Sequence, residues 1–225
     1  MRKFNISNLR LEPLVDSVNQ DIWGYEVLSD LYDNICTEEW FSNMDTIKQI
    51  SLLHKQMNAV YDLNLLRKCF FNLSAHGIIS LSQEDISRVS KFKKFSIEIS
   101  DINIIFALSQ NEMVLLLKNI NKLRLADINV WIDDLTSFNS MLLPLFVGRV
   151  DGVKIDRSEL KGGNLGKLTA QINDILGSVP VLMEGVETHS DLNIVNKFSI
   201  SHAQGYLWKS CNLVTAIPNR VSITI

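Results

Sequence analysis

The chain has 225 residues, of which 46% are hydrophobic and 21% are charged, and its formal net charge at pH 7 is -3. This composition is ordinary for a globular protein with a sizeable core, and the charge argues against direct binding to nucleic acid or to an anionic membrane surface. The sequence has no stretch of about 18 apolar residues to span a membrane, and no signal peptide is recognised at its start. We therefore expect a cytoplasmic protein that does not associate with membranes.

Short strand-like segments alternate with helical patterns along the chain. Two strands are expected first, at residues 9–18 and 22–31, and the polar residues 19–21 form the turn of an antiparallel pair. Apolar residues at helical spacing then predict a helix over residues 46–66. Further strands are predicted at residues 69–73, 95–99, 128–132, 152–155 and 179–183. Further helices are predicted at residues 104–123, 142–146, 165–176 and 191–198.

This alternation predicts an α/β fold, in which crossover helices connect the strands of a parallel sheet. Seven or eight strands suit a closed TIM-type barrel, and an open doubly wound sheet is the alternative that the pattern alone leaves open. No linker rich in Pro, Gly or Ser divides the chain, so we expect one domain over residues 1–225. The glycine pair at 162–163 is then a loop within that domain.

Acidic and amide residues fall at the finishing end of nearly every predicted strand. In a parallel barrel these strand ends meet at one mouth. A single Asp at such a place is more often a helix N-cap, but this many carboxylates together are costly to bury unless cations neutralise them. Oxygen ligands of this kind suit Mg²⁺, Mn²⁺ or Ca²⁺, and two such ions with a lysine would serve phosphodiester hydrolysis. The residues are Glu26, Asn72, Glu98, Asp133, Asp134, Lys154, Asp156, Glu184, Glu187 and Gln204.

Several of these segments resemble the EAL family of cyclic di-GMP phosphodiesterases. The run from Gly24 to Leu28 is similar to the motif that names the family, and the segments Val153-Lys-Ile-Asp and Glu184-Gly-Val-Glu-Thr are similar to two later signature segments. The resemblance extends from about Leu11 to Trp208 and implies a TIM-type (β/α)8 barrel.

The resemblance also implies roles for the residues at the strand ends. One metal ion would be bound by Glu26, Asn72, Glu98 and Asp133. A second ion and the attacking water would be served by Asp133, Asp134 and Glu184. Lys154 would position that water, and Glu187 and Gln204 would lie near the substrate.

Other positions depart from the family pattern where the substrate is held. Asp30 stands where family enzymes carry a phosphate-binding arginine, and Glu12 stands where they carry a glutamine that faces a guanine. Both changes add negative charge beside an anionic dinucleotide. Thr136 and Phe138 replace two glycines of a loop and do not readily adopt positive φ angles, so we expect that loop to take another course. Asp101 corresponds to the glutamate that anchors this loop in the family.

These departures indicate a degenerate phosphodiesterase fold that acts as a regulator by binding a protein. The resemblance to short stand-alone family members implies binding to the FlhD subunit of the flagellar master activator FlhD–FlhC. This binding would block DNA binding by the activator, promote its proteolysis by ClpXP and repress motility genes. No cofactor is then required, and Mg²⁺ or Mn²⁺ is the candidate ion for the vestigial site.

Two alternatives remain from the sequence. One is an active or slow Mg²⁺- or Mn²⁺-dependent cyclic di-GMP phosphodiesterase, and the other is a receptor that binds cyclic di-GMP without hydrolysis. For the partner surface we expect an acidic, exposed connection before a helix, where aromatic residues would anchor the contact. Its residues are Glu38, Glu39, Trp40 and Phe41.

Overall fold

The fold begins with a two-stranded antiparallel hairpin. The computed structural model describes residues 5–32, 36–63, 67–216 and 220–224 of the chain. In it, β1 (Ile6–Asp16) and β2 (Ile22–Leu31) pair antiparallel, as predicted. The turn is fixed by Asp16, whose carboxylate accepts two backbone N–H groups of the turn at 2.9 and 3.0 Å, and by Gln20, which adopts a left-handed φ of 60°.

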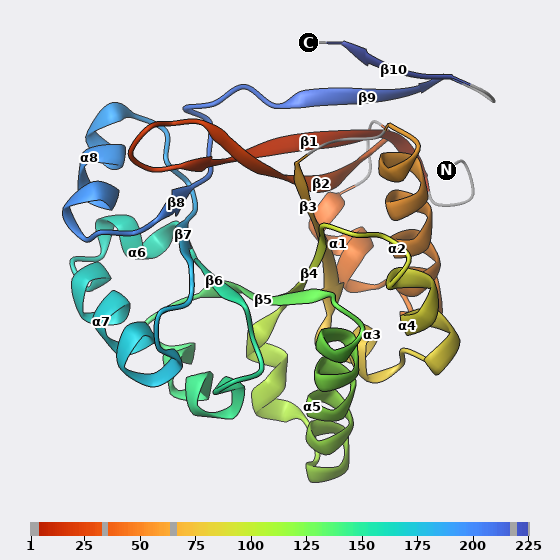
Figure 1. The fold of residues 1–225 in the computed structure, drawn as a ribbon, viewed down its shortest axis with the longest axis horizontal. Helices are drawn as coiled ribbons and strands as arrows, with labels where there is room; N and C mark the ends of the chain where they lie inside the picture. Colours follow the sequence, from red (N-terminus) through yellow and green to blue (C-terminus); the bar gives the residue numbers. More distant parts are fainter. Residues whose placement is uncertain (1–4, 33–35, 64–66, 217–219, 225) are drawn as a thin grey trace.

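Strands β1 to β8 close into a barrel (Figure 1). β2 to β8 run parallel in chain order, and β1 is antiparallel to both β2 and β8. The pairing of β1 with β8, between Val15 and Ala203, closes the sheet and excludes the open doubly wound alternative. Outside the barrel, β9 pairs with residues 9–11 of β1, and β10 pairs with β9. The remaining strands are β3 (Lys68–Ser74), β4 (Phe95–Ser100), β5 (Asn129–Leu135), β6 (Gly152–Ile155), β7 (Val181–Met183), β8 (His202–Ala203), β9 (Cys211–Ala216) and β10 (Arg220–Thr224).

Helices cover the outside of the barrel (Figure 1). α2 shows why: Asp45 caps its first turn by accepting the backbone N–H of Lys48 at 2.8 Å, and Leu53, Met57 and Val60 are buried along one side of the helix. Among the described helices, none is long and apolar enough to cross a membrane. The helices are α1 (Thr37–Ser42), α2 (Thr46–Tyr61), α3 (Ala75–Ile79), α4 (Gln83–Val89), α5 (Gln110–Leu125), α6 (Ser158–Lys161), α7 (Leu165–Leu176) and α8 (His189–Lys197), with 3₁₀ segments η2 (Ile102–Ala107) and η3 (Asn139–Phe146).

The structure differs from the predicted elements in two ways. The helix predicted over residues 104–123 is divided into η2 and α5, because Ser109 begins a new helix. Its hydroxyl accepts the N–H of Glu112 at 3.3 Å, and the Glu112 carboxylate accepts the N–H of Ser109 at 2.8 Å. The sequence pattern also predicts none of α1, α3, α4, α6, β8, β9 and β10, because short elements show no clear period. Residues 64–66 of the helix predicted over 46–66 lie outside the described residues.

The barrel interior is apolar at one end. Where the parallel strands begin, Trp23, Phe70 and Trp131 pack together with ring centroids 5.2 to 5.6 Å apart. Gly152 on β6 leaves room for this cluster, since a Cβ atom there would lie 2.3 Å from the Trp131 ring. The polar side chains of the interior are therefore gathered at the other end, where the parallel strands finish.

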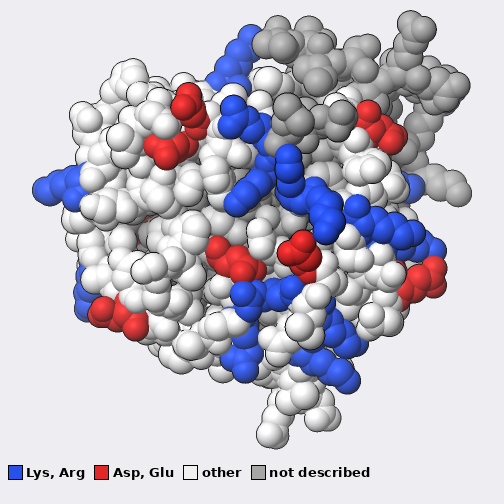
Figure 2. All heavy atoms as spheres, in the orientation of Figure 1, with Lys and Arg blue, Asp and Glu red and all other residues white. Residues whose placement is uncertain are grey.

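Lys and Arg side chains gather near the starts of the parallel strands, with acidic side chains among them (Figure 2). Arg67 and Lys68 lie at the start of β3, and Lys93 and Lys94 directly precede β4. The Lys68 ammonium lies 4.5 Å from the centroid of the Trp23 ring, which is a cation–π contact. The carboxylates of the interior lie at the opposite end of the barrel.

Candidate functional site

A buried lysine stands at the centre of the charged end of the barrel. Lys154 lies on β6, all four residues of which are buried. Its Nζ atom lies 2.9 Å from Glu26 Oε2, 2.9 Å from Glu184 Oε1, 3.2 Å from Glu98 Oε1 and 3.3 Å from Asp133 Oδ1. Burial alone would lower the pKa of Lys154, but the four carboxylates outweigh it and raise that pKa well above its usual value. Lys154 is therefore charged at neutral pH.

Glu26 is the best-satisfied carboxylate of the cluster. Besides Lys154, the side-chain amides of Asn72 and Gln204 each donate a hydrogen bond to it at 2.6 Å. Burial opposes the charged form of Glu26, yet the Lys154 charge and these three hydrogen bonds lower its pKa. Asn72 and Gln204 thus hold an ionised carboxylate in place.

Glu98 and Asp133 are buried with fewer partners. Both form an ion pair with Lys154. Among the described residues, no group donates a hydrogen bond to either oxygen of Glu98 or to Oδ1 of Asp133. Burial is the largest cause that raises the pKa of Glu98 well above its usual range and that of Asp133 to about 7, against the attraction of Lys154. These two carboxyl groups therefore bind a proton more tightly than a carboxyl group exposed to solvent does.

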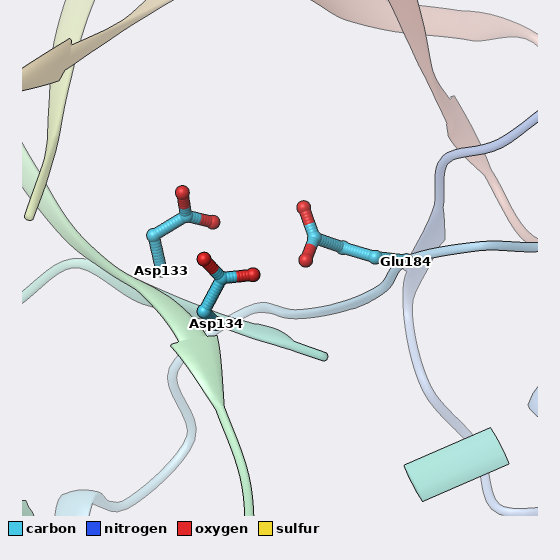
Figure 3. Close-up of side chains that lie close together, drawn as sticks. All are labelled: Asp133, Asp134 and Glu184. Carbon is cyan, nitrogen blue, oxygen red and sulfur yellow. The ribbon is translucent and has the colours of Figure 1, made fainter. Parts of the chain in front are cut away.

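Three of the carboxylates face a common space. Ligand oxygens of Asp133, Asp134 and Glu184 lie within 4.8 Å of one another, with the first two from the end of β5 and the third from the end of β7 (Figure 3). Asp134 reaches this position through a left-handed φ of 52°. Carboxylate oxygens gathered in this way fit a divalent cation. Such an ion, when bound, would polarise a phosphate and lower the pKa of a bound water.

The loop after β5 has its own anchor. Neither Thr136 nor Phe138 adopts a positive φ angle. The buried Glu159 accepts hydrogen bonds from the N–H and the hydroxyl of Ser137 at 2.7 and 2.8 Å. The loop is therefore held by Glu159, whereas Asp101, which the sequence suggested as the anchor, is exposed at the start of η2.

Arg10 is a residue of the mouth that the sequence analysis misses. Its Nε donates to Asp30 Oδ1 at 3.1 Å, and its Nη1 donates to Glu12 Oε2 at 2.9 Å. Asp30 and Glu12 are thus paired with a cation of the chain itself. The positive charge of Arg10 offsets one of their two negative charges, so an anionic dinucleotide would be repelled less than the sequence suggested. The signal was present in the hairpin, because its register sets Asn8 opposite Asp30 and brings Arg10 within reach.

The outer rim of the mouth carries the remaining predicted residues. Glu187 is exposed, and its backbone N–H donates to Asp191 at the start of α8. Asp156 accepts the N–H of Ser158 at 2.9 Å, which is a local turn contact. Both residues line a cavity of about 240 Å³ together with Gln204. Only Gln204 also reaches the buried cluster.

The segment predicted as a partner surface is the helix α1, not an extended connection. Trp40 and Phe41 are half-buried, pack against the core and contact each other with ring centroids 4.8 Å apart. Glu39 is exposed, and the side chain of Glu38 lies outside the described part. The two aromatic rings are therefore partly used in folding, which leaves less of their surface for a partner than the sequence suggested.

The sequence matches one protein family over most of its length. A family model of the EAL domain matches residues 5–210. The chain belongs to the EAL domain family. This membership confirms the family resemblance of the signature segments, and the eight-stranded barrel with its antiparallel first pair confirms the expected fold.

Solved structures of EAL proteins share this fold. An EAL domain protein from Listeria monocytogenes EGD-e is 18% identical, with 93% of this chain and 90% of that chain covered and a TM-score of 0.72. Klebsiella pneumoniae BlrP1, in a complex with manganese and cy-diGMP, is 18% identical over 91% of this chain and 56% of that chain, with a TM-score of 0.75. The EAL-like domain protein YdiV is 15% identical, with 93% of this chain and 95% of that chain covered and a TM-score of 0.68. No curated protein matches the sequence.

Proposed function

We propose that this EAL domain is a non-catalytic regulator that acts by binding another protein. The observation that carries the proposal is the edge of the mouth formed by β1 and β2, where Arg10 is bonded to Glu12 and Asp30. An anionic dinucleotide would meet two carboxylates there and one cation, which is already paired with both of them. Like charges held close together in a partly buried site cost on the order of several kcal/mol. Retained carboxylates do not make a catalyst if the substrate does not bind.

Titration calorimetry with cyclic di-GMP tests this proposal. With Mg²⁺ or Ca²⁺ present, we expect no binding heat up to a ligand concentration of about 100 μM, and no product after prolonged incubation. Micromolar binding followed by metal-dependent hydrolysis would remove the proposal. Chromatographic detection of the opened dinucleotide separates turnover from binding alone.

The partner we propose is the FlhD subunit of FlhD–FlhC, in the cytoplasm. Support comes from the family resemblance of the sequence, which implies this partner. Binding would block the activator from DNA, promote its proteolysis by ClpXP and so repress motility genes. A gel-shift assay of FlhD–FlhC on its promoter DNA tests this partner: added protein is expected to release the DNA in proportion to its concentration. If FlhD–FlhC stays on DNA and FlhD is not captured by the immobilised chain, the partner is wrong while the non-catalytic role can still hold.

A second candidate function is a slow Mg²⁺- or Mn²⁺-dependent cyclic di-GMP phosphodiesterase. The observation that favours it is the cluster of Asp133, Asp134 and Glu184, whose oxygens lie close enough together to share an ion. Glu184→Gln would then abolish any hydrolysis that the unmodified chain shows with Mn²⁺. A third outcome, binding without hydrolysis, would identify a cyclic di-GMP receptor, and the same calorimetry detects it.

A further inference from the structure

The β1–β2 hairpin places a row of polar side chains on one face. In the register of the pair, Asn8 lies opposite Asp30, Arg10 opposite Leu28 and Glu12 opposite Glu26. Alternate residues of a strand share a face, so these six side chains point to the same side. Glu26 belongs to the buried Lys154 cluster, whereas the Asp30 side chain is 36% exposed at the rim. The row therefore rises from the interior to the edge of the mouth.

Arg10 bonds to two other residues of this row, Glu12 and Asp30. Its guanidinium bonds Asp30 and Glu12 at the same time, and Asn8 Nδ2 lies 3.5 Å from the second oxygen of Asp30. The side chains of Arg10 and Glu12 are 30% and 15% exposed, so solvent weakens these contacts less than at an open surface. Burial opposes the charge of Arg10, but hydrogen bonding and attraction to Asp30, followed by Glu12, raise its pKa. The three residues carry a combined formal charge of -1.

Arg10 also stands between two cavities. A larger one, of about 770 Å³, is lined by Leu28, Phe41 and Asn72 among others, and a smaller one of about 240 Å³ is lined by Glu184 and Gln204 among others. Arg10 and Asp134 line both cavities. A ligand long enough to occupy the two together must pass the guanidinium.

We propose that Arg10, Glu12 and Asp30 form an internal ion-pair lock that keeps anionic ligands out of the mouth, and that Arg10 determines this selectivity. The inference rests on the proposed function and gives a structural reason for it. An incoming phosphate must compete for Arg10 with two carboxylates that are already in place, and it must lie beside both of them. If both carboxylates become neutral amides of the same shape, Arg10 becomes a free cation that can bind a phosphate in bidentate fashion.

Three proteins test the lock: the unmodified chain, the E12Q/D30N variant and the R10Q/E12Q/D30N variant. The two variants differ only in the arginine, so the triple variant is the matched control. Binding of cyclic di-GMP is measured by calorimetry in EDTA, which removes any contribution of metal ions. We expect E12Q/D30N to bind at least about tenfold more tightly than the unmodified chain, with an affinity that falls as salt rises, and we expect the triple variant to lose this gain.

Two results would overturn the lock. Equal binding by all three folded proteins would mean that the ion pairs do not limit ligand entry. An equal gain in both variants would mean that removal of negative charge is sufficient and that Arg10 has no part in it. Thermal unfolding of each protein establishes that it is folded. These results are separate from the proposed function, which fails if the unmodified chain binds the dinucleotide tightly or hydrolyses it.

Discussion

The most direct test of how the mouth is held together is Lys154→Met. The substitution keeps an unbranched side chain of similar length and removes the one ammonium that lies within 3.3 Å of four carboxylates. Removal of one partner from a buried ion pair costs about 3–5 kcal/mol, because the opposite charge remains buried without compensation. We expect a loss of this size in the free energy of unfolding at pH 8, measured with urea.

The loss should depend on pH, and the sign follows from the raised pKa values. A carboxyl group whose pKa is higher in the folded state holds its proton more tightly there than in the unfolded chain, so stability falls as pH rises between the two pKa values. For Asp133 that window extends from about 4, the unfolded value, to about 7 in the folded protein. Without Lys154 these groups are neutral at pH 5, and the loss there should be smaller than at pH 8.

A control variant and an added metal ion test the same prediction further. Lys167→Met, at an exposed position of α7, is the matched control and should change stability by less than about 0.5 kcal/mol. Millimolar Mn²⁺ should raise the melting temperature of Lys154→Met more than that of the unmodified protein, because a divalent ion can replace the missing ammonium. A loss below about 1 kcal/mol at pH 8, or the same loss at pH 5, would refute the reasoning.

Three smaller predictions concern the supporting structure, each measured by urea unfolding. Glu159→Ala removes both hydrogen bonds to Ser137 and should cost about 2 kcal/mol, so an unchanged midpoint would mean that the loop has another anchor. Ser109→Ala removes the cap of α5 and should cost about 1 kcal/mol; stability equal to the unmodified chain would contradict the capping box. Gly152→Ala drives a methyl group into the Trp131 ring and should cost about 1–3 kcal/mol, so an unchanged midpoint would contradict this contact.

Much of the barrel can be predicted from the sequence because its signals are local. A strand such as β7 is a short apolar run, and the polar residue Glu184 follows it directly in the sequence. Since parallel strands finish at one end, the position of a residue in its strand is enough to place Glu98, Asp133 and Lys154 together. The closed sheet could not be predicted from the pattern, because its closing contact, β1 with β8, involves few residues that lie far apart in the chain.

The contacts that decide the chemistry of the mouth depend on register and on rotamers. From the sequence, Arg10 is only one polar residue of a predicted strand. The pairing of β1 with β2 brings it beside Asp30. Glu159 lies in α6, and nothing in its sequence neighbourhood marks it as the anchor of Ser137. Sequence comparison with the family pattern pointed to Asp101 because it follows aligned positions, whereas hydrogen bonds follow distances in space.

Arg10 and Lys154 each supply positive charge to neighbouring carboxylates, Lys154 in the barrel interior and Arg10 at the rim of the mouth. Carboxylates gathered at one end of a barrel need positive charge, which can be provided by bound ions or by the chain itself. At the bottom of the mouth Lys154 provides it for four carboxylates, and at the rim Arg10 provides it for Glu12 and Asp30. In both places the compensating charge comes from the chain's own side chains.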